Sequence, residues 1–294
     1  MKTKLLRCIA CILAAVIIFS GFQLWNINRN YAQEAAMHNH VLQFRPQISF
    51  IPPSYEEYAP QYTSSTQPDN PVVNNDLIHR DGPVYSDNAA QHDNAALQIA
   101  TPPASDSPLN QSIVDLQTAY RSTIGWLTIP NTLIDYPFVQ GTDNEFYLHM
   151  DLEHNRSLAG TVFMDYRNSN DFSDFNTIIF GHNMKNGSMF GTLQHFSNPE
   201  FFHNNRVSFI VLDNKTFAIE LFAFAVINPN DSIIYDPNIT DEADKTVFLD
   251  YVQSIARHYR DIEVTSNDQI ITLSTCSYEF DNARMVLMGR LIKI

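Results

Sequence analysis

Two side chains near the C-terminus have the chemistry and the spacing to act on a carbonyl group. Cys276 ends an apolar run over residues 270–275 that is typical of a strand, and Arg284 follows eight positions later, across a polar turn. If the strands on either side of this turn pair, the thiol and the guanidinium face one another. A thiolate is a strong nucleophile and a good leaving group, and arginine is permanently charged, so the pair suits acyl transfer through a thioester.

A histidine farther upstream is placed to join this pair. His182 follows a predicted strand over residues 176–180 through Gly181, and a histidine at a strand end beside a glycine is well placed to project into a cleft. The chain has no His-x-x-x-His spacing, and its Cys-x-x-Cys spacing, Cys8 to Cys11, lies in the apolar N-terminal run, so zinc catalysis has no support in the rest of the sequence. We therefore expect no metal and no other cofactor.

Cys276 also has a plain structural interpretation, because an unpaired cysteine is often a small buried hydrophobic residue. The other two cysteines, Cys8 and Cys11, lie together at the N-terminus and form no disulfide framework with it. In a domain outside the cell, an unpaired thiol is open to oxidation and crosslinks nothing. That setting favours a use of its reactivity.

The elements that must position these residues lie in residues 110–294, where short apolar runs alternate with turn signals. That many strands in one domain predict a sandwich or a closed barrel. A helix capped by Asn110 or Ser112 precedes the strands, and an amphipathic helix over 241–260 is inserted before the strand that carries Cys276. The predicted strands are 125–129, 133–139, 160–165, 176–180, 206–212, 216–227, 269–275 and 283–292.

The N-terminus has the pattern of a membrane anchor over residues 1–27. Lys2, Lys4 and Arg7 precede an uncharged apolar run from Cys8 to Trp25, close to the roughly 20 residues that cross a bilayer. The basic flank predicts a single span with the N-terminus in the cytoplasm and the remainder outside the cell. A cleaved signal peptide and a buried soluble helix are the alternatives, but the run is long for a signal peptide and lacks a clear small-residue cleavage pattern.

Residues 28–109 differ in composition from the segments on either side. They contain ten of the fifteen prolines and many Asn, Gln, Ser and Asp residues, without helical or strand periodicity. Their low apolar content cannot offset the entropy lost on ordering. We expect a disordered stalk that tethers the folded part.

The charge balance restricts the partners. The chain has 294 residues, 44% of them hydrophobic, with 32 acidic and 18 basic residues and a net charge of −14. This is enough apolar material for one full core or two small ones. An acidic chain offers no basic patch for phosphates, which argues against nucleic acid as a partner.

Together these motifs resemble those of the sortases, membrane-anchored cysteine transpeptidases of mainly Gram-positive bacteria. The segments 273–276 and 181–184, with Arg284, carry the likeness, which covers about residues 110–294. The resemblance implies a mainly β fold: a closed eight-stranded barrel with N-terminal helices and one helix inserted before the strand that bears Cys276. Segments similar to the class B subgroup are 125–127, 135–140, 143–148, 160–165 and 187–190.

The resemblance also implies roles for individual residues: Cys276 as nucleophile, His182 as proton donor and acceptor, and Arg284 as oxyanion stabiliser. Its substrates would be secreted proteins with a C-terminal sorting motif, of the Asn-Pro-x-Thr or Ser/Pro-Pro-x-Thr kind in class B, cleaved after Thr. The acyl group would pass to an amine of a peptidoglycan precursor or to a pilin Lys.

Residues near Cys276 leave alternatives open. Strand alternation puts Ser274 on the same face as Cys276, where it could contact substrate or simply pack under the barrel rim. Glu279 and Asp281 on the turn could supply an acidic third member, but surface charge is the simpler interpretation. A cysteine peptidase shares the first half-reaction, and a non-enzymatic tethered domain that binds wall polymer would need no convergence of His182 with Cys276.

Overall fold

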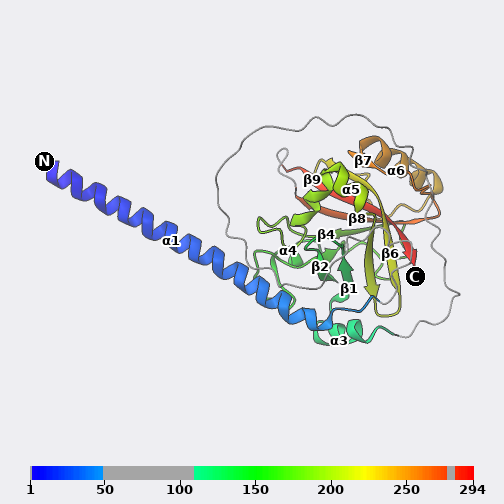
Figure 1. The fold of residues 1–294 in the computed structure, drawn as a ribbon, viewed down its shortest axis with the longest axis horizontal. Coiled ribbons are helices and arrows are strands. Elements are labelled where there is room, and N and C mark those ends of the chain that lie inside the picture. The colour runs from blue at the N-terminus through cyan, green and yellow to red at the C-terminus, as the bar shows by residue number, and fades with distance from the viewer. Residues whose placement is uncertain (1, 49–108, 277–281) are drawn as a thin grey trace. The chain divides into compact units, whose positions relative to one another are not determined.

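The computed structural model describes residues 2–48, 109–276 and 282–294, with side chains from residue 11 onward. Figure 1 shows how the described elements are arranged around one barrel. In chain order they are α1 (Lys2–Val41), η1 (Leu42–Phe44), α3 (Gln111–Ala119), β1 (Thr123–Thr128), β2 (Asp135–Gln140), α4 (Phe146–His149), β3 (Phe163–Met164), β4 (Asn176–Phe180), η2 (Gly191–Ser197), α5 (Pro199–Asn204), β5 (Val207–Leu212), β6 (Thr216–Ile227), α6 (Glu242–Ile255), β7 (His258–Tyr259), β8 (Gln269–Cys276) and β9 (Arg284–Lys293).

Eight strands close on themselves to form the barrel. Their order is β5-β1-β2-β3-β4-β8-β9-β6, and β6 pairs again with β5 to complete the circle. The predicted eight-stranded barrel is therefore confirmed, and the described residues add one short strand, β7, on the edge of β6. The predicted helix over 241–260 ends early because the chain after Ile255 pairs with β6, where Arg257 N donates to Phe224 O at 2.8 Å.

The long strand β6 is apolar throughout because both of its faces are covered. Phe217, Ile219 and Leu221 point into the barrel, whereas Phe222 belongs to a second cluster under helix α6. A register shift against β9 between Leu221 and Ala223 changes the alternation at this point. The inserted helix thus packs against the outside of the barrel and fixes the connection that leads into it.

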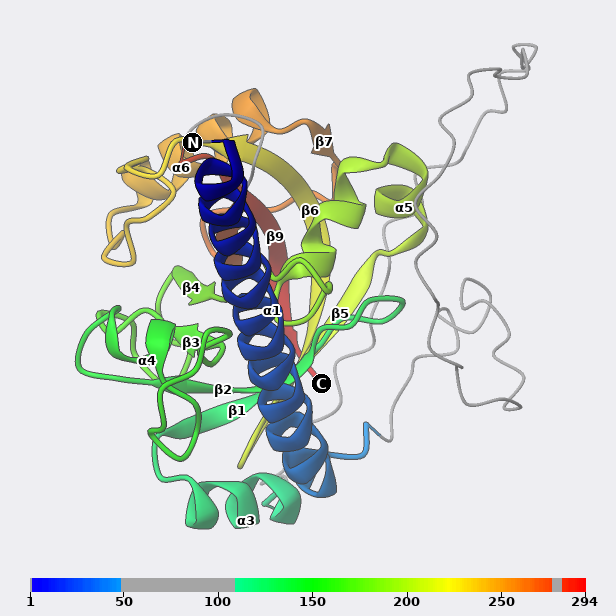
Figure 2. The same ribbon diagram turned by 90° about the vertical axis from the view of Figure 1, so that its left-hand side faces the viewer.

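Helix α1 continues past residue 27 and packs on the barrel. Figure 2 shows α1 in front of the barrel. Val41 is buried, and the ring of His38 lies 4.6 Å from the ring of Tyr136 on β2. The prediction of a stalk from residue 28 is therefore wrong for residues 28–44, which form the end of α1 and η1, because contacts with the barrel outweigh weak local propensity. The rest of the predicted stalk, residues 49–108, lies outside the described residues.

The side chains of α1 from residue 11 to residue 29 are exposed. Among the described residues, one helix, Cys11–Phe44, is long and apolar enough to cross a membrane, and none of its most apolar 18-residue stretch is buried in the protein. This helix suggests a membrane anchor.

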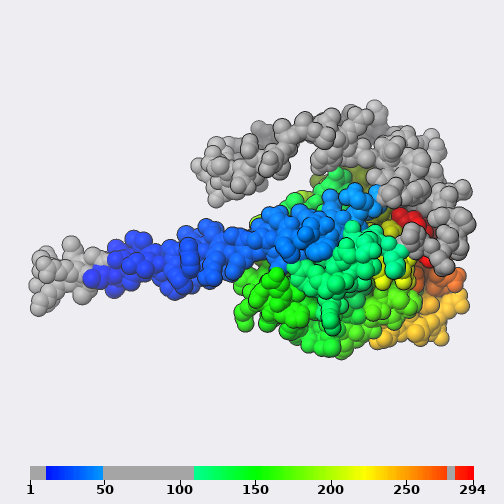
Figure 3. Space-filling view, turned by 90° about the horizontal axis from the view of Figure 1, so that it is seen from below, coloured from blue at the N-terminus to red at the C-terminus, as the bar shows by residue number. Residues whose placement is uncertain are grey.

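Helix α3 lies beside the end of α1 (Figure 3). Asn110 caps it as predicted, because its side chain accepts a hydrogen bond from Ile113 N. Tyr120 Oη and His40 Nδ1, 3.1 Å apart, link the two helices by a hydrogen bond. The expected N-terminal helices are thus present, and both contribute to the same face of the domain.

Candidate active site

Strands β8 and β9 bring Cys276 and Arg284 opposite one another. The two strands are antiparallel, and Cys276 pairs with Arg284 at the last position of their register. Both residues are partly exposed at this end of the barrel. The guanidinium is oriented by the two residues just before β9, because Nη1 donates to Asn282 O at 2.8 Å and to Ala283 O at 3.3 Å. The juxtaposition predicted from the spacing is present.

His182 reaches the same end of the barrel from the other side of β8. Strand β4 runs parallel to β8, with Phe180 opposite Ser274, and Gly181 N donates to Ser274 O at 3.2 Å. Glycine is required here because a Cβ at position 181 would lie 2.7 Å from the ring of Phe190. His182 Nε2 lies 2.8 Å from Leu148 O, and since a carbonyl only accepts, Nε2 is the donor.

The segment after His182 is tied to the strand end that carries Cys276. Asn183 Nδ2 donates to Cys276 O at 2.8 Å, and Phe190 N donates to His182 O at 2.9 Å. Met189 N donates to Tyr136 Oη at 3.2 Å, which connects the same segment to β2. The backbone around His182 is therefore held at both ends.

A cavity of ≈ 430 Å³ contains all four residues predicted from the sequence: His182, Ser274, Cys276 and Arg284. Its remaining walls come from Asn144 and Leu148, from the chain after β3, and from the connection between β6 and α6. The barrel thus gathers residues from three strand ends into one hollow large enough for several side chains of a peptide.

Ser274 lies in this cavity, but its side chain is already engaged. It is 1% exposed, and its Oγ lies 2.8 Å from Tyr235 Oη. Burial raises the pKa of Tyr235 to about 12, against the opposing effects of the Ser274 hydrogen bond and the Arg284 charge, so the phenol stays neutral near neutral pH. Sequence reasoning missed Tyr235, since the β6–α6 connection has no periodicity that would single it out.

Two further predictions concern an acidic third member and the absence of a metal site. Glu279 and Asp281, considered as an acidic third member, lie outside them. In the described part of the chain, no group of three or more His, Cys, Asp or Glu side chains is arranged to hold a metal ion, and we assign no metal ligand.

Comparisons with known proteins match most of the folded domain. A family model described as Sortase domain matches residues 127–292. Sortase B from Listeria monocytogenes is 38% identical over 183 residues, which cover 60% of this chain and 73% of that protein. Sortase B from Staphylococcus aureus is 30% identical over 183 residues, with 61% and 74% covered.

Solved structures give the same result. The X-ray structure of Clostridium perfringens sortase B has a TM-score of 0.59 and 35% identity, covering 61% of this chain and 98% of that one. A Staphylococcus aureus sortase B-substrate complex has a TM-score of 0.60 and 26% identity, covering 64% of this chain and 87% of that one.

Proposed function

Because this chain belongs to the sortase family of cysteine transpeptidases, we propose that it cleaves a C-terminal sorting signal of secreted proteins after Thr and transfers the acyl group to an amine. The observation that carries the proposal is that Cys276, His182 and Arg284 line one cavity although they come from separate strand ends. A merely structural cysteine would need neither a histidine nor an arginine beside it.

In the first half-reaction the Cys276 thiolate attacks the carbonyl carbon of the Thr residue. Arg284, directly opposite in the strand register, donates hydrogen bonds to the oxygen that becomes negative in the tetrahedral intermediate. His182 protonates the departing amine, so that the peptide bond breaks and a thioester forms. The bond from Nε2 to Leu148 O leaves Nδ1 as the ring atom that exchanges the proton.

In the second half-reaction an amine attacks the thioester. His182 removes a proton from the incoming nitrogen, and the Cys276 thiolate leaves as the new amide bond forms. The acceptor is an amine of a peptidoglycan precursor, or a pilin Lys. Ser274 and its partner Tyr235 line the same cavity as Cys276, and we assign them a contact with the sorting peptide.

The cellular setting follows from helix α1. We propose that its apolar part spans the cell membrane once, with Lys2, Lys4 and Arg7 in the cytoplasm and the barrel outside the cell. Both proposed substrates are then within reach, because secreted proteins and wall precursors are exposed on the same side of the membrane.

Mass spectrometry of the full chain in detergent tests this function. The protein is incubated with peptides of the Asn-Pro-x-Thr and Ser/Pro-Pro-x-Thr kinds, with and without an amine acceptor. We expect an acyl adduct on Cys276 that amine resolves faster than water does. Cys276→Ala should form no adduct, whereas Cys11→Ala, which changes the other free cysteine of the described residues, should behave as the parent chain.

Two outcomes would contradict the proposal. Cleavage at a rate that amine leaves unchanged, with only hydrolysed product, would identify a cysteine peptidase. If the Cys276 thiol reacts neither with the peptides nor with small alkylating reagents, the cysteine is structural.

Arg284→Lys keeps the positive charge but loses the planar fork of the guanidinium. We expect this substitution to lower kcat about 10²-fold.

A further inference from the structure

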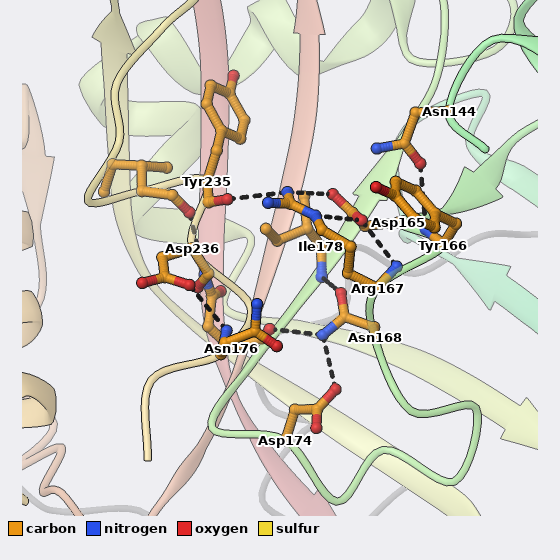
Figure 4. Close-up of polar contacts among 12 residues, drawn as sticks. Asn144, Asp165, Tyr166, Arg167, Asn168, Asp174, Asn176, Ile178, Tyr235 and Asp236 are labelled. Atoms are coloured by element: carbon orange, nitrogen blue, oxygen red, sulfur yellow. Dashed lines mark hydrogen bonds and ion pairs between the residues drawn. The ribbon is translucent and has the colours of Figure 1, made fainter. Parts of the chain in front are cut away.

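The connection between β6 and α6 forms one wall of the cavity, and side chains from elsewhere hold its backbone. Three consecutive carbonyl groups accept hydrogen bonds from side chains (Figure 4). Asn176 Nδ2 donates to Ile234 O and to Asp236 O, each at 3.0 Å. Arg167 Nη2 donates to Tyr235 O, also at 3.0 Å. We call residues 229–236 the wall segment.

The orientation of Arg167 is set by a buried carboxylate. Asp165 is fully buried, and Arg167 reaches it with two nitrogens: Nε at 2.9 Å from Oδ1 and Nη2 at 2.7 Å from Oδ2. Burial opposes ionisation of Asp165, but the hydrogen bonds and charge of Arg167 outweigh it and hold the pKa of Asp165 below its usual range. A two-pronged pair of this kind allows one orientation of the guanidinium, with Nη2 also directed at Tyr235 O.

Asn176 is fixed in the same way, from the strands that carry the reacting residues. Its Oδ1 accepts a hydrogen bond from Thr272 Oγ1 at 2.8 Å. The amide orientation is assigned by the carbonyl groups of Ile234 and Asp236, because only Nδ2 can donate to them. Asn176 lies on β4, the strand that leads to His182, and Thr272 lies on β8, four residues before Cys276. The wall segment is therefore anchored to the two strands that end at the site.

We propose that Arg167, oriented by Asp165, is a positioning residue for substrate recognition, because it fixes the wall segment and with it Tyr235 beside the cavity. This inference rests on the proposed function, and it separates recognition from chemistry. A wall that is already ordered when the peptide arrives has less conformational entropy to lose on binding. Arg167 also lines the cavity, and its guanidinium is engaged there by Asp165 and by Tyr235 O.

The substitution Arg167→Lys tests this role without leaving Asp165 unpaired. A lysine ammonium still pairs with the carboxylate, but it lacks the fork that serves Asp165 and Tyr235 O together. In the full chain, we expect the KM for a sorting peptide to rise about 10-fold, with kcat changed less than about threefold. The rate at which iodoacetamide alkylates Cys276 should stay unchanged. Arg121→Lys, at an exposed arginine, is the matched control.

Hydrogen exchange tests the same inference without any substrate. Tyr235 N donates to Asp231 O at 3.1 Å, so its exchange reports on opening of the wall segment. We expect it to exchange about 10-fold faster in Arg167→Lys, with exchange in β4 unchanged. Unchanged exchange in the wall segment, or a loss confined to kcat, would overturn the proposal. If the parent chain cleaves no sorting peptide while the exchange responds as expected, the proposed function fails and the anchoring by Arg167 stands.

Discussion

Replacing Asn176 with Ala should lower the free energy of unfolding by about 3 kcal/mol. The side chain is fully buried and makes three hydrogen bonds, two as donor to Ile234 O and Asp236 O and one as acceptor from Thr272 Oγ1. Alanine removes all three bonds and leaves two buried polar groups, Ile234 O and Thr272 Oγ1, and one half-buried carbonyl, Asp236 O, without this partner. Each such loss costs about 1 kcal/mol or more, which gives the total.

Calorimetry and urea unfolding of the full chain in detergent measure this loss. For a domain of this size, about 3 kcal/mol corresponds to a decrease in Tm of about 6–12 °C. Asn267→Ala, at an exposed asparagine, should change Tm by less than about 2 °C. Thr272→Val removes one of the same bonds, so the double variant should lose less than the sum of the single losses. An effect of Asn176→Ala equal to that of the control would refute the reasoning, because the wall segment would then be held by other contacts.

Two further predictions concern pH and the N-terminal helix. The pKa of Asp165 lies below its usual value of about 3.9, so its ion pair stabilises the fold fully above that pH and loses its effect as the pH falls through the folded-state value. Asp165→Asn should therefore lower the free energy of unfolding at neutral pH, and the loss should become smaller as the pH falls below about 4. Urea titrations of both proteins at each pH measure this difference. A difference that does not change with pH would contradict the prediction. Removing residues 1–28 should leave Tm nearly unchanged. Removing residues 1–48 should lower Tm by about 4–8 °C, because this truncation deletes the buried Val41. Equal Tm values for the two truncations would contradict the packing of α1 on the barrel.

Much of the barrel could be predicted from the sequence because its strands are short apolar runs between turns. Strands 176–180 and 216–227 begin and end where the pattern predicts. The sequence pattern fails where tertiary contacts determine the end of a helix. The apolar spacing continues past Ile255, yet pairing with β6 ends the helix there, and the polar end of α1 is helical because Val41 is buried against the barrel.

The candidate site likewise has one part that the sequence predicts and one part that it does not. The spacing of Cys276 and Arg284 favours antiparallel pairing of their two strands, and that pairing fixes which residues lie opposite, so this part was predictable. The wall segment was not, because its position depends on single hydrogen bonds from Arg167 and Asn176, which are 68 and 58 residues from the carbonyls that they hold. No local pattern records contacts of that kind.

The described residues on either side of the predicted stalk show where the chain leaves the domain and where it returns. Gln47 and Leu109 line the same cavity, of ≈ 320 Å³, beside the turn between β5 and β6, and Asn110 N donates to Asp213 O at 2.6 Å. Because the described residues on either side of 49–108 lie at one place on the domain, the distance between the barrel and the proposed anchor does not depend on that segment. That distance is set by α1, whose helix from residue 28 to Val41 rises about 20 Å. The barrel is thus joined to the proposed membrane span by helix α1 itself.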